Sequence, residues 1–307
     1  MKDLIYPQEW QDVEASIARL SDKQILFVCG AVKSGTTWTQ LWLDHHPQIV
    51  CRGEGCFFNV YAGALQQVCQ ETSKFVLRQN ATKFSDYPIF PQFNLPHVQY
   101  LLRQSVLALL ATYGDRPEIR VVAEKNPPTL QSTETALQIF PEAKILNLVR
   151  DGRDMAVSTW HENMRRNAQA FKDQFPTLDD FMPEIAKIWA NAQTIAVSSQ
   201  KTYPTQFRQI HYEDLLHSPQ PIMADVFAWL GVKADPDTVA ECCAATSFKA
   251  LSGGRDAGQT DDSSFFRCGV EAQWRLELTP AQQDIFWQIA GDAMQAQGYD
   301  KDGRVTQ

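Results

Sequence analysis

Four short segments are predicted to be strands. The first, residues 25–30, is a continuous apolar run that ends in glycine, which is typical of a strand buried on both faces of a parallel sheet. The second and third segments have the same apolar character, and the fourth is more polar. These later segments are residues 119–124, 144–149 and 206–211.

Segments with helical spacing of apolar residues lie between the strands. They are residues 35–46, 98–113, 129–140, a helix from Asp151 onward, and 219–230, where Pro219 begins the helix. Strands that alternate with helices predict an α/β fold with a parallel β-sheet flanked by helices. No repeat or linker divides the chain, so we expect a single domain over residues 1–307, with ligands bound at the C-terminal ends of the strands.

Two segments do not fit this alternation. Residues 84–97 contain four aromatic residues and three prolines, which indicates an irregular aromatic loop. Residues 252–264 are polar and rich in glycine, so we expect a mobile loop there. We interpret the first as an acceptor-side loop and the second as a lid-like loop.

Composition and charge narrow the class of protein. The chain has 307 residues, of which 44% are hydrophobic, and its formal net charge is −8. That charge argues against a non-specific nucleic-acid binder, since phosphate backbones require a surplus of cations. The longest strongly apolar stretch, residues 106–111, is far too short to span a bilayer. The N-terminus lacks the apolar run of a signal peptide, so we expect a cytoplasmic protein without membrane contact.

Cysteine and histidine patterns do not predict a metal site. The seven cysteines form no CxxC pair, and an odd number fits reduced thiols better than a disulfide framework. His161 and Glu162 begin like a zinc-protease motif, but Arg165 stands where the second histidine would be. We therefore expect no metal requirement.

The clearest chemical motif follows the first predicted strand. Residues 30–37, here called the phosphate loop, contain two glycines five positions apart and then hydroxyl residues that open a helix. Backbone N–H groups of such a loop and of the helix N-terminus bind phosphate oxygens. Thr36 stands where a nucleoside-triphosphate loop has its lysine, and the cation lies inside the loop as Lys33. The loop thus predicts phosphate binding of a different kind from that of an ATPase.

Residues 33–38, with the sequence KSGTTW, closely resemble the 5′-phosphosulfate loop of sulfotransferases that use 3′-phosphoadenosine-5′-phosphosulfate (PAPS). Arg150 at a predicted strand end and Ser158 eight residues later resemble the 3′-phosphate motif of that family. Guanidinium and hydroxyl donors suit a phosphate group. The resemblance implies that PAPS is bound by Lys33, Ser34, Gly35, Thr36, Thr37, Trp38, Arg150 and Ser158.

Further segments resemble the family in the same order along the chain. Tyr212 follows the fourth strand, where the family tyrosine approaches the adenine. Phe248 resembles the phenylalanine that stacks on adenine opposite the tryptophan of the phosphate loop. Arg267 and Gly269 resemble the late Arg-Lys-Gly turn that closes on the 3′-phosphate, with Cys268 in place of the lysine. The resemblance covers most of residues 25–299 and implies the sulfotransferase fold.

The resemblance leaves the catalytic base open. Small-molecule members of the family carry a Lys-Thr-His segment whose histidine is the base, whereas this chain keeps Lys125 and has Pro127 at the histidine position. Tyrosylprotein sulfotransferases instead draw a carboxylate from the segment after the first helix, which points to Glu54. Lys33, Glu54 and Lys125 are therefore the expected catalytic residues. His161 and His211 remain alternative bases.

The sequence thus predicts an enzyme that moves a sulfuryl group from PAPS to a hydroxyl or amine acceptor by in-line displacement. Its nucleotide product would be adenosine 3′,5′-bisphosphate (PAP). Such a transfer depends on positioning and charge stabilisation. The expected acceptor is a small molecule or natural product. A P-loop small-molecule kinase and a non-catalytic nucleotide-binding module are the alternatives, and the oligomeric state is open.

Overall fold

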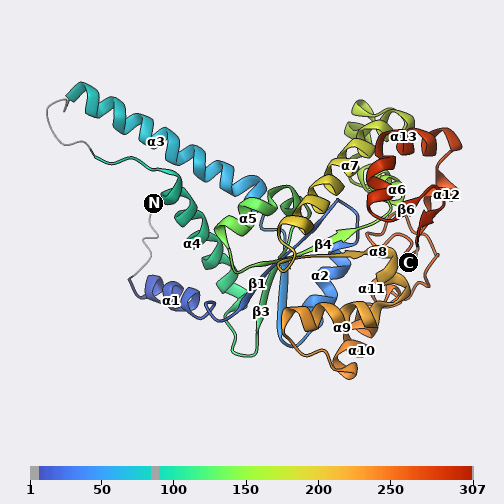
Figure 1. The fold of residues 1–307 in the computed structure, drawn as a ribbon, viewed down its shortest axis with the longest axis horizontal. Coiled ribbons are helices and arrows are strands. Elements are labelled where there is room, and N and C mark those ends of the chain that lie inside the picture. The colour runs from blue at the N-terminus through green and yellow to red at the C-terminus, as the bar shows by residue number, and fades with distance from the viewer. Residues whose placement is uncertain (1–6, 84–89, 306–307) are drawn as a thin grey trace.

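The computed structural model describes residues 7–83 and 90–305, and its centre is a five-stranded parallel sheet (Figure 1). The strand order is β2-β3-β1-β4-β5. The strands are β1 (Gln24–Gly30), β2 (Ile49–Gly53), β3 (Val121–Lys125), β4 (Lys144–Val149) and β5 (Phe207–His211). A short antiparallel pair, β6 (Tyr299–Asp300) and β7 (Gly303–Arg304), lies near the C-terminus. The predicted α/β fold and all four predicted strands are confirmed.

The edge strand β2 is not among the four predicted strands. It pairs in parallel with β3, from Ile49 beside Val121 to Gly53 beside Lys125. Its sequence has three apolar residues followed by exposed Arg52 and Gly53, so the apolar run is too short to indicate a sheet strand. An edge strand needs less apolar surface, because one of its sides has no neighbouring strand.

Helices cover both faces of the sheet. They are α1 (Pro7–Ala18), α2 (Thr36–His45), α3 (Ala62–Lys83), α4 (Leu95–Gly114), α5 (Thr133–Ile139), α6 (Gly152–Gln174), α7 (Leu178–Thr202), α8 (Tyr212–His217), α9 (Pro219–Leu230), α10 (Pro236–Ala245), α11 (Phe248–Leu251), α12 (Trp274–Glu277) and α13 (Pro280–Ala296). A π-turn, η1 (Phe57–Tyr61), and a 3-10 turn, η2 (Pro127–Ser132), complete the set.

Alternate residues of the central strand feed two separate cores. Phe27 is fully buried on one face, among side chains from α4, α5, α7 and α13. Val28 is fully buried on the other face, among side chains from α2, α9 and α10. Successive strand residues point to opposite faces, so a strand covered on both sides reads as one continuous apolar run. This double burial fixes the end of β1, where the phosphate loop begins.

Several boundaries differ from the sequence prediction. The helix expected over 129–140 is a 3-10 turn followed by α5, because Pro127 and Pro128 begin the turn and leave a short helix after it. Residues 95–97 of the predicted aromatic loop belong to α4, which Asn94 caps by accepting a hydrogen bond from the His97 N–H at 3.2 Å. Residues 84–89 of that loop lie outside the described residues.

In the parts that are described, no helix is both long and apolar enough to cross a membrane.

Candidate donor and transfer site

The phosphate loop leaves the sheet at the C-terminal end of β1 and leads directly into α2. Two of its residues adopt left-handed backbone conformations, Lys33 with φ 60° and Gly35 with φ 94°. A side chain at Gly35 would also place a Cβ atom 2.7 Å from Cδ2 of Tyr212. The close approach and the positive φ both require glycine. The turn aims the first N–H groups of α2 into one cavity, which is the geometry of an anion site.

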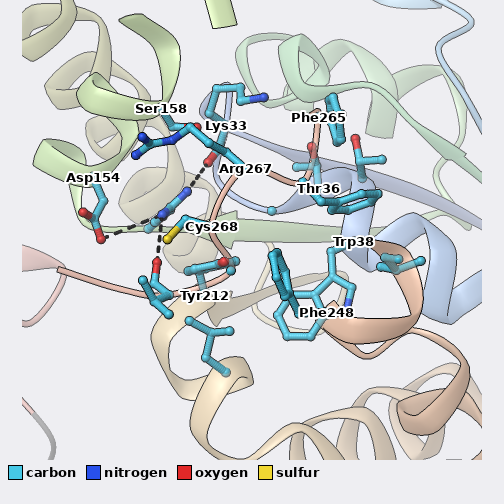
Figure 2. A pocket seen from close by; sticks show the side chains of 18 of the residues that line it. Lys33, Thr36, Trp38, Asp154, Ser158, Tyr212, Phe248, Phe265, Arg267 and Cys268 are labelled. Carbon is cyan, nitrogen blue, oxygen red and sulfur yellow. Dashed lines mark hydrogen bonds and ion pairs between the residues drawn. The ribbon is translucent and has the colours of Figure 1, made fainter. Parts of the chain in front are cut away.

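This cavity has a volume of about 880 Å³ and holds nearly all of the predicted site residues (Figure 2). Those that line it are Lys33, Gly35, Thr36, Thr37, Trp38, Glu54, Arg150, Ser158, Tyr212, Phe248, Arg267 and Gly269. The two remaining candidates do not line the cavity: Ser34 of the phosphate loop is fully buried, and Lys125 is buried and contacts Glu54. The donor-side and transfer-side candidates therefore share one continuous space, although they come from residues 33 to 269.

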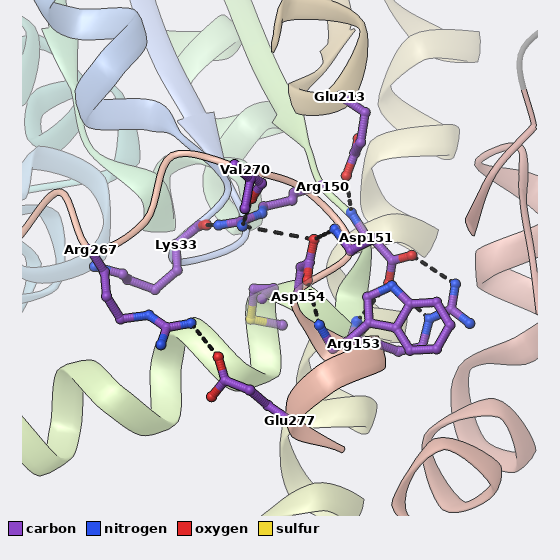
Figure 3. Close-up of polar contacts among 12 residues, drawn as sticks. Lys33, Arg150, Asp151, Arg153, Asp154, Glu213, Arg267, Val270 and Glu277 are labelled. Atoms are coloured by element: carbon purple, nitrogen blue, oxygen red, sulfur yellow. Dashed lines mark hydrogen bonds and ion pairs between the residues drawn. The ribbon is translucent and has the colours of Figure 1, made fainter. Parts of the chain in front are cut away.

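Arg150 lies at the end of β4, beside the phosphate loop (Figure 3). Its Nη1 donates to the carbonyl of Lys33 at 3.2 Å, and Nη2 lies 3.5 Å from the carbonyl of Val270 and 3.8 Å from Asp154. The guanidinium also packs over the ring of Tyr212, with 4.4 Å from Cζ to the ring centroid. Arg150 thus connects the phosphate loop with the segment that follows Arg267.

An anionic ligand fits the donors that the protein leaves unused. In the described structure, Arg150 Nε and Ser34 Oγ are buried and have no hydrogen-bond partner. Buried polar atoms normally find partners, since leaving one unpaired costs about 1–3 kcal/mol. Both atoms lie at the phosphate loop or next to it, so these residues suit the phosphate groups of a nucleotide.

Aromatic side chains form the opposite end of the cavity. The Trp38 indole donates from Nε1 to the carbonyl of Thr246 at 2.8 Å and packs edge-on against Tyr212, with 5.9 Å between ring centroids. Gly269 has φ 68°, and a Cβ atom there would lie 2.1 Å from the Phe248 ring. The Gly269 backbone therefore packs directly on Phe248. Flat apolar surfaces beside an anion site are suited to a nucleobase.

Arg267 is not a free cation in this structure. Its Nη2 lies 2.6 Å from Glu277, and Nη1 lies 3.4 Å from Asp262 (Figure 3). Cys268, at the position of the family lysine, is buried and its sulfur accepts a hydrogen bond from Thr260. The late turn therefore contributes one paired arginine to the cavity wall and no lysine.

Lys33 also has a protein partner. Its ammonium lies 3.4 Å from Oε2 of Glu162 on α6 and 4.4 Å from the centroid of the Phe265 ring. Burial lowers the pKa of Lys33, while Glu162 opposes that shift. The donor-site lysine is thus held by residues that the sequence motifs did not indicate.

At the transfer end, Glu54 and Lys125 form a close ion pair. Lys125 Nζ lies 2.6 Å from Glu54 Oε1, and the Lys125 side chain is 7% exposed while that of Glu54 is 47% exposed. Glu124, next to Lys125, is buried and accepts a hydrogen bond from the N–H of Gly55 at 2.8 Å. Burial raises the pKa of Glu124 to about 7. The hydrogen bond from the Gly55 N–H opposes this shift, and the charge of Glu54 adds to it. The turn that carries Glu54 is therefore anchored to β3.

The two alternative bases lie elsewhere. His161 Nε2 lies 2.5 Å from Oε2 of Glu277, which also binds Arg267. It borders a small side cavity of about 10 Å³ next to Lys33. His211 contacts the carbonyl of Gln297 at 3.1 Å, and burial lowers its pKa to about 4. Neither histidine lines the main cavity as the structure describes it.

Four functional candidates were not predicted from the sequence. Asp154 accepts hydrogen bonds from the N–H groups of Ala272 at 2.7 Å and Trp274 at 3.0 Å, which ties the late turn to α6. Glu162 and Phe265 hold Lys33, and Glu277 holds Arg267. One signal in the sequence could have indicated the two acids on α6. Positions 154, 158 and 162 are four residues apart, so Asp154 and Glu162 lie on the same helix face as Ser158. No local signal marks Phe265 or Glu277.

Among the described residues, no group of three His, Cys, Asp or Glu side chains could hold a metal ion.

Comparisons with known proteins agree with this geometry. Residues 25–236 match the profile described as the Sulfotransferase family. The chain is similar to protein-tyrosine sulfotransferase 2 of Gallus gallus, with 23% identity over 214 residues that cover 68% of this chain and 51% of that protein. It spans about half the length of the first curated relatives it matches.

Solved structures share the fold. Sulfotransferase STF9 from Mycobacterium avium superposes with a TM-score of 0.54 at 13% identity, covering 97% of this chain and 82% of the other. Mouse sulfotransferase SULT7A1 complexed with PAP gives a TM-score of 0.50 at 17% identity, covering 92% and 88%. Since the matched residues 25–236 make up more than half of the chain and contain the phosphate loop, Glu54, Lys125 and Arg150, the chain belongs to the Sulfotransferase family.

Proposed function

We propose that this protein transfers a sulfuryl group from PAPS to a hydroxyl or amine acceptor and releases PAP. One observation carries the proposal: a single cavity contains both the phosphate loop and the carboxylate Glu54, which is paired with Lys125. The family, and the PAP complex of a protein with the same fold, support the choice of nucleotide.

In this proposal the residues divide the chemistry between them. The N-terminus of α2 and Lys33 stabilise the charge that develops on the 5′-phosphate as its bond to sulfur breaks. Glu54 accepts the proton of the acceptor hydroxyl while the new oxygen–sulfur bond forms. Lys125 donates to Oε1 of Glu54, and Oε2 is the proposed proton acceptor. Arg150 and Ser158 bind the 3′-phosphate, and Trp38 and Phe248 enclose the adenine.

The kinase alternative has no supporting observation. Thr36 occupies the position of the kinase lysine, and among the described residues no cluster of three or more His, Cys, Asp or Glu side chains could hold a metal ion. We propose that Lys33 and Lys125 provide the charge stabilisation that magnesium provides in kinases, so a chelator should leave activity intact.

We further propose a small-molecule acceptor and a cytoplasmic location. Apolar side chains in the lining of the cavity, including Val32, Pro127 and Phe265, suit a small organic acceptor. All seven cysteines are unpaired, as is usual in a reducing compartment.

The direct test measures thermal stabilisation by PAP and by ATP with magnesium. A ligand at about 100 times its dissociation constant adds about 2.7 kcal/mol to the free energy of unfolding. We expect PAP to stabilise the protein and ATP with magnesium to have little effect. Labelled PAPS should then pass its sulfuryl group to members of a hydroxyl and amine acceptor panel in the presence of EDTA. Stabilisation by ATP alone, or an absolute need for a metal, would contradict the proposal.

A further inference from the structure

The lysine of the phosphate loop is already paired with an acid of the protein. Glu162 Oε2 lies 3.4 Å from Lys33 Nζ, and the two side chains are only 16% and 19% exposed. The ammonium also lies over the Phe265 ring, which follows the lid-like loop (Figure 2). A donor phosphosulfate bound at the loop would therefore compete with Glu162 for the same cation.

Glu162 has other partners that would remain if Lys33 moved away. Arg165 Nη2 donates to both of its carboxylate oxygens, at 2.9 Å and 3.0 Å. Arg166 Nε lies 3.7 Å from Oε1. The carboxylate thus keeps a compensating charge without Lys33, so the usual penalty for an unpaired, partly buried charge is small here.

The main chain of Lys33 is fixed, whereas its side chain has a choice of partners. Arg150 binds the Lys33 carbonyl at 3.2 Å, and the residue is held in the left-handed conformation by the loop. The ammonium can change partner by rotation about side-chain torsions alone. Because burial disfavours the charged form of Lys33, the ammonium requires an anion nearby in both states.

We propose that Glu162 is a positioning residue that holds Lys33 in the donor-free enzyme and gives it up to the phosphosulfate end of the donor. The inference rests on the proposed function, because it takes a phosphosulfate nucleotide as the competing anion. Glu162 then lowers donor affinity without touching the reacting atoms. Its removal strengthens donor binding, which is the opposite of what the loss of a binding residue does.

The test measures the affinity of PAP by titration calorimetry for the wild type, Glu162→Gln and Glu162→Asp. We expect Glu162→Gln to bind PAP about twofold to fivefold more tightly, the range of a partly exposed ion pair. Glu162→Asp keeps the charge but withdraws it by one methylene, so it should also bind more tightly. Glu184→Gln, which removes an exposed carboxylate on α7 that pairs with Lys187, is the control and should match the wild type.

A double-mutant cycle with Lys33→Ala shows whether the effect passes through Lys33. In that background, Glu162→Gln should leave PAP affinity unchanged. Equal tightening in both backgrounds, or wild-type affinity for Glu162→Asp, would mean that Glu162 acts only through its general negative charge, and would overturn the inference. Failure of the wild type to bind PAP at all would instead refute the proposed function.

Discussion

Among single residues, Glu54 has the most direct part in the proposed chemistry. It borders the cavity, is about half exposed, and contacts a lysine that is almost fully buried. Glu124 accepts a hydrogen bond from the N–H of the following residue, Gly55, so two adjacent residues of β3, Glu124 and Lys125, fix the position of Glu54. An acceptor can therefore approach a carboxylate that is already held in place.

Glu54→Gln should lower turnover by about 10²–10⁴-fold, the usual contribution of a general base, while PAP affinity stays within about twofold of the wild type. Gln keeps the shape and removes the basic oxygen. Steady-state kinetics and calorimetry provide the two readouts. Glu71→Gln on α3 removes an exposed carboxylate that does not line the cavity and serves as the control. Near-normal turnover of Glu54→Gln, together with a large loss in His161→Ala, would transfer the role to the histidine.

Arg150→Ala should weaken PAP much more than adenosine 5′-monophosphate, which lacks the 3′-phosphate. A charge-assisted hydrogen bond contributes roughly 1.5–3 kcal/mol, or about 10- to 150-fold in affinity. Competition titrations of both nucleotides measure the ratio. Ser158→Ala removes only a neutral donor and should change the ratio less. If Arg150→Ala weakens both nucleotides equally, Arg150 only supports the phosphate loop through the Lys33 carbonyl.

Glu124 should make folding stability depend on pH. Its pKa is raised by burial to about 7 from an ordinary value of 4.5, so the folded protein binds this proton more tightly than the unfolded chain. Its contribution to stability is then complete below pH 4.5 and is lost as pH rises through about 7. Glu124→Gln resembles the protonated acid. Relative to the wild type it should gain on the order of 2 kcal/mol in urea unfolding between pH 5 and 8. A constant difference across this range would contradict the assignment.

Among the elements, the strands were largely predictable and several helices were not. A strand buried on both faces leaves a continuous apolar run, which fixes β1, β3 and β4 to within about two residues. Several apolar residues of helix α3, including Val68, Phe75 and Leu77, are exposed, so its apolar positions do not mark a single buried face. The ordered motifs predicted residues that the structure brings to one cavity, and their role in nucleotide binding stays a prediction. The partners of Lys33 and Arg267 were not identified, because these contacts join residues far apart in sequence or on segments without a pattern.

The lid-like loop, residues 252–264, should become more protected from hydrogen exchange when PAP binds. Arg255 already donates to the carbonyls of Gln259, Phe266 and Arg267, which links the loop to the turn beside the cavity. A nucleotide that contacts Arg267 and Phe248 would stabilise these links. Exchange mass spectrometry with and without PAP measures the change, and residues 62–83 of α3 should stay the same. Unchanged exchange in 252–264 would rule out a lid.

At the scale of the whole molecule, the order of the strands in the sheet determines where the charged residues of the cavity lie. The phosphate loop follows the central strand β1. Of its two neighbours, β3 ends in Lys125, and β4 is followed directly by Arg150. Strand β2 lies at the edge, with Glu54 directly after it, and the chain then continues through η1 into α3 and α4 on that side of the sheet (Figure 1). The phosphate loop and Arg150 therefore follow interior strands of the sheet, and Glu54 follows an edge strand.

This placement has a consequence for how such an enzyme diversifies. The interior strands each have two neighbours, so an insertion there shifts the register on both sides and disturbs the cationic groups together. The edge strand β2 has one neighbour, and the helices after it can lengthen, shorten or change sequence without moving the phosphate loop. Glu54 is the one described residue of 54–114 that lines the cavity, so sequence changes in residues 57–114 should leave the phosphate loop and Arg150 in place.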